Sequence, residues 1–270
     1  MSPPTTLPTT TRRRFLTAAA VLPVVGAAPF VLDGFVGPDG SDTETTGEQE
    51  LRITSNNGRY QAWADPLPEG ASIYAPGPRR QSTITVRDQL TGAGRTLTLD
   101  RNLEPEAFSP DGATLFAIDH RPAMAPEIYR VSTIDVAAGV VTDTLGPRKL
   151  ALIEEMRGEG REQVWSPAGD QLYTLYIRQW HDHARHTDSS HDEVHFTDAF
   201  VHVLDVANDW ALCVELPEGI GLGPAGSTAI MVDETGTTIT VVDHALGARI
   251  DVTRLADEGA YEVGELTRFG

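Results

Sequence analysis

The sequence of 270 residues predicts an all-β domain built from about four four-stranded antiparallel sheets. A turn motif recurs at intervals of 57 residues, at positions 109–112 (Ser-Pro-Asp-Gly), 166–169 (Ser-Pro-Ala-Gly) and 223–226 (Gly-Pro-Ala-Gly). Apolar and polar residues alternate in the segments beside these turns, and β-branched residues are frequent there, which is typical of antiparallel strands. Because one four-stranded sheet cannot bury both of its faces, repeated sheets are expected to stack on one another.

Composition excludes several classes of function. The chain has 21 basic against 39 acidic residues and a net charge of −18, with no basic cluster beyond the N-terminal region, which argues against nucleic-acid binding. Cys213 is the only cysteine, so an intrachain disulfide and a cysteine-rich metal site are excluded. With apolar neighbours in its strand, its thiol is expected to be buried and inert.

Residues 1–28 have the organisation of an export signal. Three arginines (Arg12, Arg13 and Arg14) precede a short apolar run that ends in small residues. The segment 11–16 (Thr-Arg-Arg-Arg-Phe-Leu) resembles the twin-arginine signal, from which only Thr17 departs, since the consensus has lysine there. The resemblance implies export by the twin-arginine route to the periplasm, the cell surface or the medium. We expect cleavage after residue 27 or 28, with no integral membrane span afterwards; an uncleaved N-terminal anchor is the alternative.

Residues 29–49 are rich in Gly, Asp, Thr and Glu without periodicity, which predicts a flexible linker. The repeats then occupy approximately 50–102, 103–159, 160–217 and 218–270, and residues 55–58 (Ser-Asn-Asn-Gly) are a degenerate first copy of the turn. Each unit is expected to be strand, turn, strand, loop, strand with a terminal aspartate, turn and strand. The recurring aspartates are expected to accept hydrogen bonds from the backbone of the turn that follows. They are Asp88, Asp135, Asp205 and Asp243.

The segment 108–116 (Phe-Ser-Pro-Asp-Gly-Ala-Thr-Leu-Phe) resembles the blades of the YVTN, TolB and WD-repeat-like β-propellers, and the likeness extends over residues 50–255. The resemblance implies a β-propeller-like domain, although those propellers have more and shorter blades. A closed four-bladed ring, a five-bladed ring and an open arc that pairs with a second chain remain as alternatives, and we favour a small closed ring. The segment 261–266 is a candidate to complete the blade begun at residues 50–53 and so to close the ring.

Function is expected where the repeats differ, in the loops between the second and third strands. In propellers of this type these loops share one face with the connections between blades, and that face commonly binds ligands. The loop 65–81 carries Arg79 and Arg80, and the loop 180–197 begins with Trp180, whose ring is suited to stacking on a ligand. The loop 180–197 also holds five of the eight histidines, which are His181, His183, His186, His191 and His195.

Clustered imidazoles suit Zn, Cu or Ni, which makes the five histidines candidate metal ligands. A solvated polar loop and a pH-sensitive switch are the alternatives. The sequence therefore favours an exported binding module that takes a protein or a small molecule on this loop face. The alternative is a metal-binding protein or a metal-dependent hydrolase or lyase. Crowding of the histidines into one loop favours binding over catalysis, and no catalytic residue is assigned.

Overall fold

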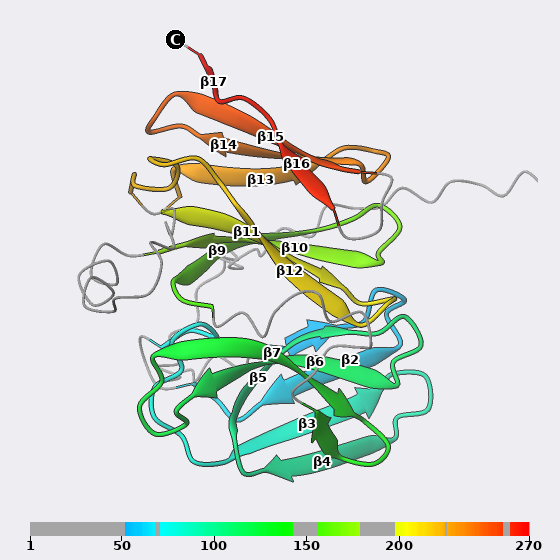
Figure 1. The fold of residues 1–270 in the computed structure, drawn as a ribbon. Coiled ribbons are helices and arrows are strands. Elements are labelled where there is room, and N and C mark those ends of the chain that lie inside the picture. The colour runs from blue at the N-terminus through cyan, green and yellow to red at the C-terminus, as the bar shows by residue number, and fades with distance from the viewer. Residues whose placement is uncertain are drawn as a thin grey trace, which may run out of the picture. The chain divides into compact units, whose positions relative to one another are not determined.

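The computed structural model describes residues 52–67, 71–142, 156–178, 198–224, 226–255 and 260–269. These residues form an all-β, propeller-like domain of four antiparallel sheets, as predicted (Figure 1). The described part of the chain contains no helix, and therefore none that could cross a membrane. The export signal, the linker and the loop 179–197 lie outside the described residues.

Each of the first three sheets is built from four strands that pair in chain order. The first contains β1 (Arg52–Thr54), β2 (Tyr60–Ala64), β3 (Ser82–Asp88) and β4 (Gly94–Leu99). The second contains β5 (Asn102–Phe108), β6 (Thr114–Arg121), β7 (Ile128–Asp135) and β8 (Val140–Thr142). The third contains β9 (Glu159–Trp165), β10 (Gln171–Ile177), β11 (Ala199–Asp205) and β12 (Trp210–Glu215).

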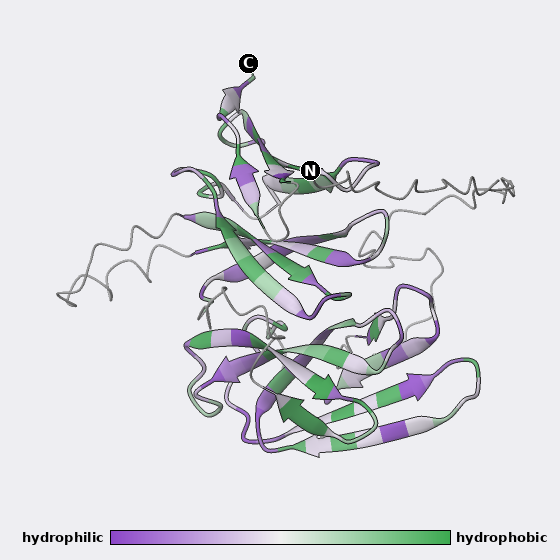
Figure 2. Ribbon diagram, turned by 45° about the vertical axis from the view of Figure 1, so that its right-hand side comes forward, coloured by the Kyte–Doolittle hydropathy of each residue, from purple (hydrophilic) through white to green (hydrophobic). Residues whose placement is uncertain are grey.

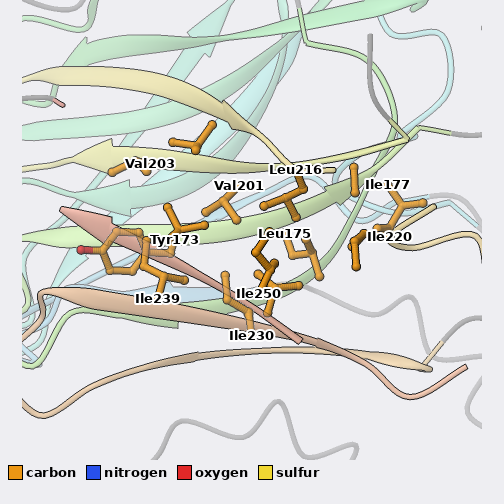
Figure 3. Packing of buried hydrophobic residues seen from close by; sticks show 14 residues of the cluster. Tyr173, Leu175, Ile177, Val201, Val203, Leu216, Ile220, Ile230, Ile239 and Ile250 are labelled. Atoms are coloured by element: carbon orange, nitrogen blue, oxygen red, sulfur yellow. The ribbon is translucent and has the colours of Figure 1, made fainter. Parts of the chain in front are cut away.

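Three hydrophobic clusters join consecutive sheets. The first and second sheets share one cluster, the second and third share another, and the third and fourth share the largest. Figure 3 shows residues such as Leu175, Val201 and Ile250 filling the space between the third and fourth sheets. Along many strands hydrophobic and hydrophilic residues alternate (Figure 2), as the side-chain period of two requires when one face is buried. In β3, for example, Ile84 and Val86 are buried while Thr85 between them is only partly covered.

The repeated turns have the chemistry that the sequence predicts. In the second sheet the Gly112 N–H donates to the Ser109 carbonyl at 2.9 Å, and Gly112 has a φ of +75°. A Cβ at this position would lie 2.1 Å from the Tyr60 ring. Both this collision and the positive φ therefore disfavour any residue other than glycine here. The turns of neighbouring sheets meet at one end of the stack, where the Asn57 amide donates to the Pro110 carbonyl at 3.1 Å. We call this the turn end.

The four recurring aspartates act as predicted. Asp88 accepts from the Leu90 N–H at 2.8 Å, and Asp135 accepts from the Ala138 N–H at 2.7 Å. Asp205 likewise accepts from the Asn208 N–H at 2.8 Å, and Asp243 accepts from the Leu246 N–H at 2.9 Å. These carboxylates therefore fix hairpin turns and are not a ligand set.

The fourth sheet corrects the sequence interpretation. It contains β13 (Thr228–Val232), β14 (Thr238–Asp243), β15 (Ala248–Arg254) and β16 (Tyr261–Val263), and β17 (Thr267–Arg268) also pairs with β15. The expected strand before residues 223–226 is absent from the described residues 216–224. The turn that reproduces the repeated hydrogen bond is instead 233–236, where the Gly236 N–H donates to Asp233 at 3.0 Å. The sheet is thus one strand out of phase with the sequence repeat.

Packing gives the physical reason for this shift. β13 lies beside β9, the first strand of the third sheet, and the Ile230 N–H donates to the Glu162 carboxylate at 3.0 Å. A Cβ on Gly236 would lie 3.4 Å from Pro167 in the turn of the third sheet. β13 therefore takes the place of a first strand, although its local sequence resembles a second one.

Ring closure by the C-terminal segment was also predicted wrongly. β16 pairs with β15 as the outer strand of the fourth sheet, and it does not pair with β1. Among the described residues no hydrophobic cluster joins the first sheet to the fourth. The face of the first sheet that points away from the second carries Thr83, Thr85, Thr96 and Thr98, which form two cross-strand pairs. Trp63, the cross-strand neighbour of Thr85, lies on the same face, so this face carries an aromatic ring among its threonines.

Candidate functional site

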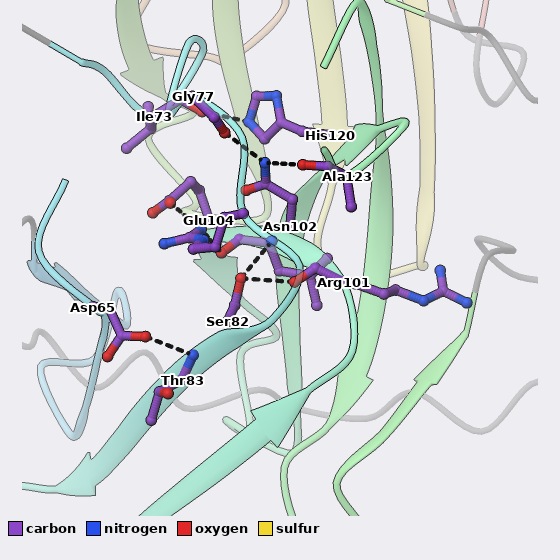
Figure 4. Close-up of polar contacts among 12 residues, drawn as sticks. Asp65, Ile73, Gly77, Ser82, Thr83, Arg101, Asn102, Glu104, His120 and Ala123 are labelled. Atoms are coloured by element: carbon purple, nitrogen blue, oxygen red, sulfur yellow. Dashed lines mark hydrogen bonds and ion pairs between the residues drawn. The ribbon is translucent and has the colours of Figure 1, made fainter. Parts of the chain in front are cut away.

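A polar network fixes the described part of the 65–81 loop to the second sheet (Figure 4). The His120 Nε2 is 2.7 Å from the Ile73 carbonyl oxygen. The Asn102 amide donates to the carbonyls of Gly77, at 2.9 Å, and Ala123, at 3.2 Å. His120 and Asn102 are both buried. The loops 71–81 and 122–127 therefore meet at one end of the stack, which we call the loop end.

The two predicted arginines differ in their surroundings. Arg79 is mostly buried: its guanidinium donates to the Leu103 carbonyl at 2.8 Å and pairs with the Glu104 carboxylate. Burial raises the pKa of Glu104 to about 7, and the charge of Arg79 opposes that rise. Arg80 is exposed beside it. Arg79 thus anchors the loop from inside, while Arg80 lies on the surface of the loop end.

A shallow depression of about 200 Å³ adjoins this anchored loop. Its lining includes Arg101 and Arg121, whose guanidinium groups both reach one oxygen of Asp119, at 2.9 and 2.6 Å. His120 also lines it, and burial lowers the pKa of that imidazole to about 4, so it is neutral at physiological pH. The depression therefore combines basic and acidic side chains in fixed positions.

Trp180 and the five histidines of the 180–197 loop lie outside the described residues. The ends of that segment are described: the Arg178 N–H donates to the Asp198 carbonyl at 2.7 Å. The Arg178 side chain pairs with Glu215 at 2.6 Å and lies over the Phe200 ring at 4.4 Å. Elsewhere in the described ranges no group of three or more His, Cys, Asp or Glu side chains is arranged to hold a metal ion.

Glu106 is a feature that the sequence interpretation did not single out. It lies at an irregularity of β5, between Pro105 and Ala107, and its carboxylate accepts no hydrogen bond from the described residues. Burial raises the pKa of Glu106 to about 7. His202 on β11 is likewise fully buried, with an Nδ1 that has no partner among the described residues, and burial lowers its pKa to about 4.

Tyr74 comes from the anchored loop and packs against the third sheet. Its ring meets the edge of Tyr176 with centroids 5.2 Å apart, and its hydroxyl accepts a hydrogen bond from the Gln163 amide at 3.0 Å. A Cβ on Gly160 would lie 2.2 Å from the Tyr74 ring. Burial, and then the charge of Glu106, raise the pKa of Tyr74.

A signal for this part of the site exists in the sequence. β5 reads Asn-Leu-Glu-Pro-Glu-Ala-Phe, with two glutamates in the strand that precedes the turn at 109–112. Glutamate is rarely buried without a partner, so two of them in one strand are unusual. In a chain with 39 acidic residues that signal is easily overlooked. Cys213, expected to be buried, is only partly covered and packs beside the cluster between the second and third sheets.

No family model and no curated protein matches this chain. Among solved structures, TolB from Acinetobacter baumannii is 12% identical and covers 79% of this chain and 43% of its own, with a TM-score of 0.37. The β-propeller domain of the Trilobed protease from Pyrococcus furiosus is 12% identical, and the match covers 79% of this chain and 56% of that one, with a TM-score of 0.35. Kuenenia stuttgartiensis Hydrazine Synthase is 16% identical, and the match covers 74% of this chain and 51% of that one, with a TM-score of 0.40. The chain thus spans about half the length of each, and none of these likenesses assigns it an activity.

Proposed function

We propose that this chain is an exported, propeller-like binding module whose ligand, a protein or a small molecule, is held at the loop end. The observation that carries the proposal is the anchoring of the 71–81 loop by buried polar contacts to Asn102, Glu104 and His120. Binding residues are characteristically placed on loops that a rigid scaffold positions. A loop fixed in this way loses little conformational entropy on binding.

Arg80 is the residue of this surface that we propose to contact the ligand; Trp180, which the sequence also suggests, lies outside the described residues. Arg80 is exposed and directly follows the buried Arg79–Glu104 pair, so its backbone is held in place. Export by the twin-arginine route rests on the sequence of residues 11–16. The proposed location of the module is therefore the periplasm, the cell surface or the medium.

The full-length chain should be screened by thermal shift against organic acids, amines, saccharides and dipeptides, and each hit mapped by amide hydrogen exchange. We expect hits to protect residues 71–81 and 122–127. Arg80→Ala should weaken binding, whereas Arg87→Ala, an exposed arginine on β3, should not. Hits that protect only the turn end, at residues 109–112 and 166–169, would contradict the proposal, and so would an absence of hits.

A metal-binding role is the second candidate, because five histidines fall within residues 181–195. The described ends of that segment are joined at Arg178 and Asp198, which shortens the span that a metal would have to organise. We expect Zn, Cu or Ni to be retained by the full-length chain purified without a chelator. A variant with all five histidines changed to alanine should lose it, and equal metal content in the two proteins would exclude the site.

A further inference from the structure

The first and fourth sheets each have one face that no other sheet covers. Hydrophobic clusters join the first sheet to the second, the second to the third and the third to the fourth, so each of the two middle sheets is packed on both sides. Among the described residues no hydrophobic cluster covers the far side of the first sheet or of the fourth. In a stacked repeat, further units add at such end faces.

The face of β1–β4 that points away from the second sheet, which we call the first outer face, is basic and contains an aromatic ring. One cross-strand row holds Arg52, Trp63, Thr85 and Thr96, and the Arg52 guanidinium lies over the Trp63 ring at 4.8 Å. Arg87 is exposed in the next row. No residue that β1–β4 place on this face is acidic, although the chain contains 39 acidic residues. Protein interfaces are enriched in Trp and Arg and depleted of Asp and Glu, so this composition is typical of an interface.

The face of β13–β16 that points away from the third sheet, which we call the fourth outer face, combines apolar side chains with a net negative charge. Met231 on β13 is 51% exposed, and Val242 on β14 is partly exposed on the same face. Asp251 and Arg249 form an ion pair at 2.8 Å. Because the charges of Asp251 and Arg249 offset each other, the exposed Glu262 on β16 gives this face its net negative charge.

The two charged side chains that distinguish these faces, Arg87 and Glu262, lie toward the same end of their sheets. The cross-strand rows that contain them begin beside the turns 55–58 and 233–236, which are both at the turn end. Arg87 belongs to the third strand of its sheet and Glu262 to the fourth. The third and fourth sheets stack with their first strands, β9 and β13, side by side, and the same alignment between two chains would bring the two charges close together.

We propose that the first outer face of one chain packs against the fourth outer face of a second copy, and that two copies close into a ring of eight sheets. The fourth outer face corresponds to the face by which the third sheet meets the fourth, so the contact repeats the stacking within the chain. Two copies of four sheets give eight, within the range of about four to eight blades that is typical of β-propellers. A head-to-tail contact either closes into a ring or polymerises, and closure covers both outer faces of both chains. The proposal goes beyond binding at the loop end, since neither face includes residues 71–81 or 122–127.

Sedimentation equilibrium of the full-length chain over a range of concentrations measures this association. Two chains of net charge −18 repel each other at long range, so the buffer should contain about 0.15 M salt, which screens charges more than about 8 Å apart. We expect a reversible association that ends at twice the mass of one chain. A chain that stays single at every concentration would overturn the proposal, and so would masses that keep increasing beyond two chains.

Reversing one charge on each face tests which faces meet. Arg87→Glu and Glu262→Arg should each weaken the association at least about tenfold, because each places like charges opposite one another. Glu127→Arg is the matched control, since it makes the same change as Glu262→Arg at an exposed position of the second sheet, and it should leave the association unchanged. Thermal unfolding establishes that each variant is folded.

A mixture of the two variants distinguishes a head-to-tail contact from any other. In a mixed pair, one contact joins two unaltered faces and the other joins two reversed faces, whose charges attract each other again. Equal amounts of Arg87→Glu and Glu262→Arg should therefore associate about as tightly as the wild type, and so should the double variant. Association of either single variant at wild-type strength, or no recovery in the mixture, would overturn the assignment of the two faces.

Discussion

The buried carboxylate of Glu106 should make the stability of this protein fall as pH rises through neutrality. Its pKa is 4.5 in an unfolded chain and about 7 in the folded protein, so the folded state holds the proton more tightly. The stabilisation is present at pH values below the unfolded pKa and is lost as pH rises through the folded one. Between about pH 5 and about pH 8 this linkage amounts to about 2.5 kcal/mol, at about 1.4 kcal/mol for each pH unit.

Glu106→Gln removes this dependence while keeping the size of the side chain. Urea unfolding of both proteins across that pH range should show the variant gaining about 2.5 kcal/mol relative to the wild type from the acidic to the alkaline end. Glu127→Gln is a matched control, because it makes the same chemical change at an exposed position. If the stabilities of the wild type and Glu106→Gln run parallel with pH, the carboxylate is not protonated in the folded state and the reasoning fails.

The opposite pH dependence is expected for His202, because burial lowers its pKa from 6.5 to about 4. Its contribution to the free energy of unfolding is therefore lost as pH falls through that range. In urea unfolding, His202→Gln should gain about 2.5 kcal/mol relative to the wild type from about pH 7.5 down to about pH 4.5. Gly112→Ala should cost at least about 2 kcal/mol in the same assay, and Gly58→Ala about 1, because only the first adds a collision to a positive φ. Replacing Arg12 and Arg13 by lysine should leave the precursor inside the cell in a fractionation experiment.

The repeated architecture was predictable because it depends on short-range chemistry. In the turn at residues 109–112 and in the turns after the strand-end aspartates, the residue types themselves favour the backbone conformation that is observed. Strand alternation such as that of β3 identifies a buried face without knowledge of what covers it. These local rules are the reason that the four sheets were found.

The phase of the fourth sheet was not predictable from the same rules. Residues 223–226 and 233–236 both read as turns, and the aspartate turn after Asp243 has the same hydrogen bond wherever its hairpin lies in a sheet. Which strand becomes the first one is decided by its contact with β9, between residues more than sixty positions apart. Local sequence carries no information on that choice.

The candidate site divides in the same way. Sequence identified the 65–81 loop and its exposed Arg80 because that loop interrupts the repeat. It did not distinguish the buried Arg79 from its neighbour, since the partner Glu104 comes from another strand. Nor did it identify Tyr74 as the ring between Gly160 and Tyr176, three segments that only the stacking of sheets brings together.

The sequence by itself determined the all-β class, the four sheets, the turns and the aspartates that fix them, because each depends on the backbone preferences of a few adjacent residues. Only the tertiary structure decided the order of strands in the last sheet, the edge position of β16 and the burial of Glu106. Those properties depend on which sheet faces pack against each other. The free energy that favours one packing comes from contacts between segments that are distant in the sequence, so a pattern of adjacent residues does not predict it.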